Sequence, residues 1–153
     1  MVQRVKRAEV RVGGEVAGRI GPGLLVFAGI MEGDTEADLA KMARKTAALR
    51  IFDDAAGTMN LPVTSVKGGG ILAVSQFTLC AETAKGNRPS YIRAMRPEAA
   101  KGMFERFTKL LRESGVIVET GVFQAEMEVE LVNDGPVTLW LDSRGGSVAS
   151  TTP

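Results

Sequence analysis

Apolar and polar residues alternate in several short segments of this chain, beginning near its amino terminus. Within residues 2–12, Ala8, Val10 and Val12 share one face and charged residues share the other, which is the pattern of a strand with one buried side. Residues 24–30 are continuously apolar, as in a strand covered on both faces. We expect further strands at residues 15–20, 71–77 and 116–119.

The strictest alternation occupies residues 123–131, where apolar residues from Phe123 onward alternate with polar ones. This alternation predicts a strand. Residues 133–135 (Asn-Asp-Gly) then predict a turn. Residues 136–141 predict a final strand, because a sheet tolerates proline at the start of a strand.

Two segments have the spacing of a helix. In residues 34–50, Thr35 and Asp38 are placed as in a capping box, and apolar residues then recur every three or four positions. The second helix is expected to begin at Pro97, since proline is favoured in the first helical turn. Gly115 is placed to end it.

The order of these elements predicts one α/β domain with a mixed sheet and two helices on one side of it. We assign residues 1–144 to this domain, which fits the length of 153 residues. Residues 53–57 and 81–88 are polar and are expected to be surface loops. Residues 145–153 are small and mostly polar, and we expect them to form a disordered tail.

The amino-acid composition excludes several kinds of binding and catalysis. The 19 basic and 18 acidic residues give a net charge of +1, which excludes a strongly basic coat for long nucleic acid but permits a local contact with an RNA end. A single cysteine excludes an intramolecular disulfide and multi-cysteine metal clusters. Histidine is absent, which excludes Ser-His-Asp and Cys-His catalysis. No apolar run approaches the ~20 residues of a membrane helix, so we expect a soluble, cytoplasmic protein.

Three candidate sites have simpler interpretations. Lys67 precedes three glycines, but a phosphate-binding loop needs Gly-Lys-Ser/Thr opening a helix, so a turn is favoured. Glu126, Glu128 and Glu130 share one face of the predicted strand, which is either a cation site or, more commonly, a solvated face. Cys80 has no imidazole to activate it and is expected to be a packing residue.

Two polar segments are stronger candidates. Residues 75–78 (Ser-Gln-Phe-Thr) follow a predicted buried strand, at a place where loops often carry function. Residues 133–138 (Asn-Asp-Gly-Pro-Val-Thr) are the second segment. From the residues alone, the first could equally cap its strand and the second could be an ordinary hairpin turn.

Taken together, these segments and the basic loop at residues 85–90 (Lys-Gly-Asn-Arg-Pro-Ser) resemble the D-aminoacyl-tRNA deacylase family. The resemblance extends over residues 1–143 and includes residues 3–5, 21–26, 50–52 and 59–61. It implies a three-layer α/β/β domain with barrel-like sheets. It also implies a homodimer that hydrolyses the ester between a D-amino acid and the 3′ end of tRNA, without a cofactor or metal and with neither DNA nor a membrane as a partner.

The resemblance also implies roles for individual residues. The bond between Gly135 and Pro136 is expected to be cis and to reach into the partner's pocket, beside the loop at Ser75. Thr138 is expected to touch the substrate or support that loop. Lys85 and Arg88 are expected to contact the RNA end. Asn87 departs from the family, in which its position is often basic, and this weakens the expected RNA contact.

A mechanism follows from these expectations. D and L esters are equally reactive, so a rigid wall of main chain at residues 135–136 is expected to exclude the L side chain. Glycyl esters have no side chain to exclude and should also react. Thr78 has no histidine base and is a weak nucleophile. We therefore expect the terminal 2′-hydroxyl of tRNA to assist and backbone N–H groups of Phe77 and Thr78 to stabilise the oxyanion. Gln76 and Ser75 are expected to orient the adenosine and that loop.

Two other functions fit the same residues. A non-catalytic module that binds RNA ends would explain the basic loop and the absence of histidine. A related deacylase that clears a mischarged L-amino acid would need a relaxed wall, which the resemblance at residues 133–138 argues against.

Overall fold

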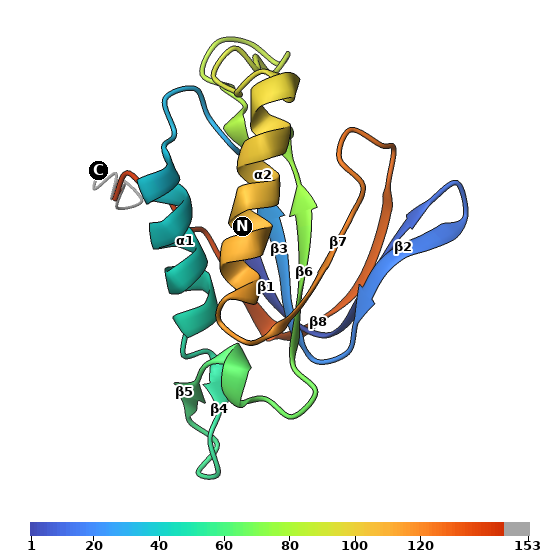
Figure 1. Ribbon diagram of the computed structural model, residues 1–153, viewed down its shortest axis with the longest axis vertical. Coiled ribbons are helices and arrows are strands. Elements are labelled where there is room, and N and C mark those ends of the chain that lie inside the picture. Colours follow the sequence, from blue (N-terminus) through green and yellow to red (C-terminus); the bar gives the residue numbers. More distant parts are fainter. Residues whose placement is uncertain (146–153) are drawn as a thin grey trace.

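Two helices lie against one face of a strongly bent sheet in the computed structural model, which describes residues 1–145 (Figure 1). The helices are α1 (Glu36–Ala48) and α2 (Pro97–Arg112), with short 3-10 turns η1 (Val63–Ser65) and η2 (Phe77–Cys80). The strands are β1 (Val2–Val12), β2 (Glu15–Ile20), β3 (Gly23–Ala28), β4 (Phe52–Asp53), β5 (Met59–Leu61), β6 (Gly70–Ser75), β7 (Ile117–Thr120) and β8 (Glu128–Leu139). The predicted mixed α/β class is confirmed.

The main sheet has the order β2-β1-β3-β6-β7, and β8 pairs with the other edge of β1. Strands β3, β6 and β7 are mutually parallel, whereas β1 is antiparallel to β2, β3 and β8. The sheet curls until β2 approaches β7. A Cβ atom added at Gly18 would lie 2.6 Å from the Thr120 carbonyl oxygen, so only glycine permits this approach. The result is the expected three-layer arrangement with a nearly closed, barrel-like sheet.

The central strands are buried on both faces, as the apolar run predicted. Leu24 and Val26 of β3 belong to a core shared with both helices, whereas Leu25 belongs to a second core inside the curled sheet. Strand β6 repeats this division with Ile71 toward the helices and Leu72 toward the inside. Two separate cores therefore hold β3 and β6 from opposite sides, which fixes the carboxyl ends of these strands.

The helix predictions are confirmed with shorter boundaries. The Thr35 side chain accepts a hydrogen bond from the Asp38 backbone, and the Asp38 side chain accepts one from the Thr35 backbone, which completes the capping box of α1. Pro97 occupies the first turn of α2. Strands β3 and β6 end at Ala28 and Ser75, two residues before their predicted ends.

The strand prediction for residues 123–131 is wrong in its first half. The backbone turns at residues 123–125, Gln124 has a φ of 62°, and β8 begins only at Glu128. The alternation misled because Phe123, Ala125 and Met127 are half-buried and their polar neighbours are exposed, even though they pair with no strand. The alternation of half-buried and exposed residues thus begins before the residues that form the β8 strand.

The predicted turn at residues 133–135 is also wrong, because β8 continues through it to Leu139. Gln3 of β1 pairs with Thr138 and Val5 pairs with Asn133, so residues 134–137 lie opposite Arg4 alone. Residues 134–137 therefore form a bulge in β8, called the β8 bulge below. The peptide bond between Gly135 and Pro136 in this bulge is cis.

The loops are largely as expected. Strands β4 and β5 form a small antiparallel hairpin around the predicted loop at residues 53–57, and these two short strands were not predicted. Residues 82–90 are exposed, as the loop prediction required. The predicted tail at residues 145–153 lies, except for Gly145, outside the described residues.

Closure of the sheet gives the first testable prediction. Gly18→Ala should destabilise the fold by about 1–3 kcal/mol, because the added methyl group meets main chain that cannot rotate away. Gly102→Ala is the matched control: nothing lies within 4 Å of its added Cβ in α2, so it should stabilise by about 1 kcal/mol. Urea denaturation measures both changes. Equal effects of the two variants would contradict close contact between β2 and β7.

Candidate active site

The first sequence-predicted segment lies at the carboxyl end of β6. Ser75 pairs with Ala28 as the last residue of β6, and the Gln76 backbone N–H donates to the Ala28 carbonyl oxygen at 2.8 Å. The chain then turns into η2, which carries Phe77 and Thr78 on the surface. Since both cores hold the preceding strand, this short segment has a rigid support.

A cavity of about 780 Å³ opens beside this segment. Ser75, Gln76 and Phe77 line one side of it, and the segment from Tyr91 to Pro97 lines another. Residues 123–125 with Met127 and Val129 close it from the β8 side. The Phe77 and Tyr91 rings meet edge to face at 5.0 Å between centroids. The cavity therefore offers exposed aromatic surface next to polar side chains.

The start of η2 presents two unused hydrogen-bond donors. Within the described part of the chain, the backbone N–H groups of Phe77 and Thr78 donate to no acceptor, whereas the Leu79 N–H donates to the Gln76 carbonyl oxygen. Adjacent free N–H groups can bind an oxygen that carries developing negative charge. The backbone thus has the donors that an oxyanion site requires.

The Thr78 hydroxyl has only an amide beside it. The Gln76 side-chain nitrogen donates to the Thr78 Oγ1 at 2.5 Å, and no carboxylate or amine in residues 1–145 is hydrogen-bonded to that oxygen. An amide cannot accept the hydroxyl proton at neutral pH, so it does not make the hydroxyl a strong nucleophile. This contact suits a positioning role for Gln76.

Cys80 lies at the other end of η2 with its side chain buried. Its Sγ is 3.6 Å from the Ile30 carbonyl oxygen, and burial raises the pKa of the thiol above its usual value. A protonated, enclosed thiol is inert. This environment agrees with the packing role expected for Cys80.

The second predicted segment is the β8 bulge, and a buried arginine holds it. Arg4 is 7% exposed, and its Nε lies 3.3 Å from the Asp134 carbonyl oxygen and 3.2 Å from the Asp134 carboxylate. Its Nη1 donates to the Ile51 carbonyl oxygen at 2.6 Å. The surroundings of the Asn133 amide assign its nitrogen to the side of the Arg4 carbonyl oxygen, to which it then donates at 2.7 Å. Arg4 therefore fixes the bulge through both its guanidinium and its main-chain carbonyl oxygen.

Within one chain the two predicted segments do not share a cavity. Gly135 and Pro136 are exposed on the bulge, Thr138 is exposed beside it, and none of the three lines the cavity beside β6. Lys85 and Arg88 are exposed on the loop after η2, also outside the lining. The structure therefore brings together Ser75, Gln76 and Phe77, with Thr78 next to them on η2.

Several lining residues were not predicted. Phe123 and Met127 were predicted only as apolar positions of a strand, and the turn before β8 places them at the cavity wall, where they also pack against the two cores. Tyr91 and Arg96 lie in a segment without regular periodicity, and sequence patterns gave them no role. Arg96 places a cation at the wall of the cavity. The segment that carries Tyr91 and Arg96 is held at this wall by main-chain hydrogen bonds, such as that from the Met95 N–H to the Ile30 carbonyl oxygen at 2.9 Å, which sequence patterns do not indicate.

The simpler interpretations of the remaining candidates agree with the structure. Gly68, after Lys67, has a φ of 70° in a turn before β6. Glu130 is exposed and pairs with Arg7 at 3.0 Å. Among the described residues, no three carboxylates or thiols are grouped as ligands for a metal ion. No helix in residues 1–145 is long and apolar enough to span a membrane.

Known proteins resemble this chain over nearly its whole length. D-aminoacyl-tRNA deacylases of Anaeromyxobacter dehalogenans and Geobacter sulfurreducens are 58% and 53% identical to it, covering 94% and 96% of this chain and 96% of each relative. A solved structure titled c-Myc DNA Unwinding Element Binding Protein superimposes with a TM-score of 0.86 at 43% identity, covering 92% of this chain and 95% of its own.

A second solved structure, a probable eukaryotic D-amino acid tRNA deacylase, has a TM-score of 0.70 at 16% identity over 88% of this chain and 93% of its own, and it shares the fold. A model of the family described as D-Tyr-tRNA(Tyr) deacylase matches residues 1–142. Fold and relatives define a hydrolase of the deacylase class. The chain belongs to the D-Tyr-tRNA(Tyr) deacylase family.

The arginine that holds the bulge gives the second prediction. Arg4→Met should destabilise the protein by about 2–4 kcal/mol, since it leaves the Ile51 and Asp134 carbonyl oxygens without their donor. Arg7→Met in the same strand removes only an exposed ion pair with Glu130 and should cost less than about 1 kcal/mol. Thermal denaturation compares the two variants. A smaller loss for Arg4→Met than for Arg7→Met would show that the bulge does not depend on Arg4.

Proposed function

We propose that this chain hydrolyses the ester bond of D-aminoacyl-tRNA, and of glycyl-tRNA, and that it spares L-aminoacyl-tRNA. The observation that carries the proposal is the pair of free backbone N–H groups at Phe77 and Thr78 beside a large aromatic cavity, in a member of a deacylase family. The same substrate would place the protein in the cytoplasm, where tRNA is charged.

The cavity suits the terminal adenosine of tRNA. Its volume of about 780 Å³ accommodates a nucleoside, and Phe77, Tyr91 and Phe123 supply aromatic faces for base stacking. Ser75 and Gln76 supply polar atoms at the same wall. We assign Ser75 and Gln76 to orienting the adenosine, which leaves the ester next to the start of η2.

The chemical step needs no histidine. A water oxygen attacks the ester carbonyl carbon, and the negative charge that forms on the carbonyl oxygen is held by the Phe77 and Thr78 N–H groups. The adjacent ribose 2′-hydroxyl assists by orienting the water and relaying its proton. The bond to the 3′-oxygen then breaks, that oxygen takes the proton, and free tRNA and the amino acid leave.

Discrimination between D and L esters requires a wall on one side of the Cα atom. We assign that wall to the main chain of Gly135 and Pro136, supplied by a partner subunit in a homodimer. Both residues are exposed and lie apart from the cavity of their own chain. Arg4 and Asn133 fix this main chain, so it cannot move aside for an L side chain. Thr138, exposed beside the bulge, would support the wall or contact the substrate.

Lys85 and Arg88 suit contact with the phosphates that precede the adenosine. Both side chains are exposed on the loop between η2 and α2, and neither forms an ion pair within the described residues. Asn87 between them adds no charge. A contact limited to two cations agrees with the small net charge of the protein.

A paired deacylation assay tests the proposed function. D-tyrosyl-tRNA and glycyl-tRNA should be hydrolysed, and L-tyrosyl-tRNA should be released at least about a hundredfold more slowly, because only its side chain meets the wall. Release of radiolabelled amino acid measures each rate. Binding of tRNA without release of any amino acid would favour a non-catalytic module. Faster release of the L ester would favour a deacylase of mischarged L-amino acids.

The role of the substrate in catalysis can be tested on the tRNA itself. A tRNA that ends in 2′-deoxyadenosine should be hydrolysed at least about a hundredfold more slowly, since the assisting hydroxyl is missing. Thr78→Ala should retain measurable turnover, because the backbone donors remain. Normal hydrolysis of the deoxy substrate would refute assistance by the 2′-hydroxyl. Complete loss of turnover in Thr78→Ala with intact binding would make Thr78 the nucleophile.

The wall is tested at Gly135. A Cβ added there would lie 2.8 Å from the Val137 Cγ2 and 3.0 Å from the Val137 nitrogen, and the residue has a φ of 119°. Gly135→Ala should displace the bulge and change the ratio of D to L hydrolysis by at least about tenfold. Gly14→Ala, at a φ of 85° with nothing within 4 Å, is the control and should keep the ratio. An unchanged ratio in Gly135→Ala would exclude this segment from discrimination.

A further inference from the structure

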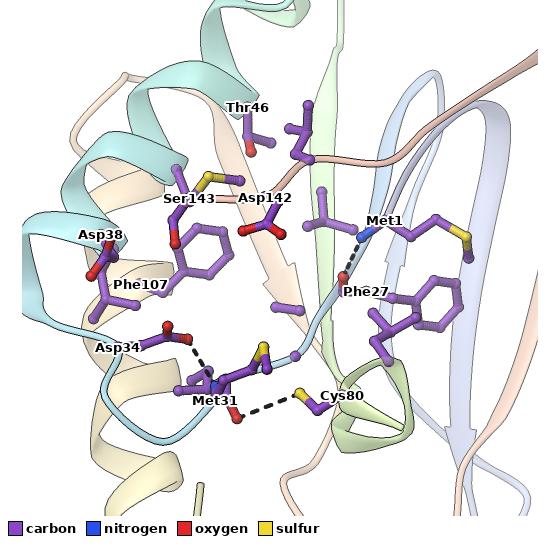
Figure 2. A pocket seen from close by; sticks show the side chains of 18 of the residues that line it. Met1, Phe27, Met31, Asp34, Asp38, Thr46, Cys80, Phe107, Asp142 and Ser143 are labelled. Carbon is purple, nitrogen blue, oxygen red and sulfur yellow. Dashed lines mark hydrogen bonds between the residues drawn. The ribbon is translucent and has the colours of Figure 1, made fainter. Parts of the chain in front are cut away.

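A second, smaller cavity lies behind η2. It has a volume of about 130 Å³ and is bounded by the end of β3, by α1 and by residues 140–144 (Figure 2). Leu79 and Cys80 of η2 line it, whereas Phe77 of the same turn lines the large cavity. The two cavities therefore lie on different sides of the segment that carries Thr78, and the proposed function makes no use of the second one.

The interior of this cavity is apolar. Leu39 and Met42 of α1 and Phe107 of α2 form much of its wall, together with Ile30. Its volume is similar to that of the engineered apolar cavity of about 150 Å³ that binds benzene in another protein. A ligand that fills it has on the order of five or six non-hydrogen atoms.

One buried polar group points into this apolar space. The Thr46 side chain lies on α1 and its residue is 1% exposed, and Figure 2 shows its hydroxyl directed toward the cavity. Within residues 1–145 no group is hydrogen-bonded to this hydroxyl, and since no fully enclosed side-chain oxygen of these residues lacks a partner, the oxygen is reached from the cavity. A ligand with an N–H or O–H group in the cavity could therefore bond to it directly.

Three carboxylates give the cavity an acidic rim. Asp34, Asp38 and Asp142 line it, against Arg144 and the amino-terminal ammonium of Met1. Both cations already have partners: the Arg144 guanidinium pairs with the rim carboxylate of Asp34 at 3.1 Å, and the Met1 nitrogen donates to the Phe27 carbonyl oxygen at 2.8 Å. The Asp142 Oδ1 accepts a hydrogen bond from the backbone N–H of Arg144, and the Asp142 Oδ2 accepts none from the described residues.

These observations define the chemistry of a ligand. The free Asp142 Oδ2 and the Thr46 hydroxyl both accept N–H donors, and the net negative rim disfavours an anion. The apolar wall requires a short branched or linear carbon chain behind the charged group. We propose that this cavity is a binding site for a small alkylammonium ion, separate from the deacylase site.

Three probes of one shape test the proposal on the intact protein without tRNA. Isobutylamine, isobutanol and isobutyrate differ in charge but have nearly the same size. Trp140 is the only tryptophan and lines the cavity, so its fluorescence reports occupancy. Isobutylamine should bind with a dissociation constant at least about tenfold lower than that of isobutanol. Isobutyrate should show no saturable binding. Equal binding of all three, or of none, would overturn the proposal.

Matched variants locate the binding. Thr46→Val keeps the shape of the side chain and should raise the dissociation constant of isobutylamine by about fivefold or more. The melting temperature of this variant should be unchanged or higher. Asp142→Asn should raise the dissociation constant of isobutylamine by about tenfold and leave that of isobutanol unchanged. Thr108→Val is the control, because Thr108 is also a buried helical threonine but lies outside the lining. Unchanged binding in both Thr46→Val and Asp142→Asn would overturn the assignment to this cavity.

Discussion

The hydrogen bonds of Arg4 to the β8 bulge are the interaction on which the proposed specificity depends. Its guanidinium is almost completely buried and bonds at once to the Asp134 carbonyl oxygen in the bulge and to the Ile51 carbonyl oxygen before β4. A planar guanidinium with fixed donors holds two segments in one geometry better than a flexible ammonium would. Gly135 completes the arrangement, because a side chain there would meet Val137. A main-chain segment fixed in this way can exclude a ligand by shape alone.

The proposed chemistry depends on a different part of the same sheet. Two cores pack against opposite faces of β3 and β6 and so fix the position of Ser75 at the end of β6. The turn η2 follows, and its first two backbone N–H groups donate to no acceptor within the described residues. A protein without histidine can still stabilise an oxyanion in this way, since backbone N–H donors need no particular side chain. The proposal therefore assigns shape selection to the bulge and charge stabilisation to η2, two segments that lie apart within one chain.

Much of the fold followed from residue patterns. The capping residues Thr35 and Asp38 and the first-turn Pro97 located both helices, and the apolar run at residues 24–30 correctly indicated a strand buried on both sides. The bulge did not follow, because Asn-Asp-Gly before a proline has the composition of a turn. Its true conformation depends on Arg4, a residue about 130 positions away in sequence. The cavity residues Tyr91 and Phe123 were missed because neither lies in a regular element: Tyr91 belongs to the segment between η2 and α2, and Phe123 to the turn before β8.

The central claim is that the bulge of one subunit acts on the site of its partner, and a mixed dimer tests it most directly. Phe77→Pro removes one backbone donor and leaves the bulge intact, whereas Gly135→Ala alters the bulge and leaves η2 intact. A heterodimer of the two variants, purified through two different affinity tags, has one working η2. If the bulge acts across the interface, that η2 faces an unaltered bulge, and the heterodimer should have the wild-type ratio of D to L hydrolysis. A ratio equal to that of Gly135→Ala alone would contradict the account.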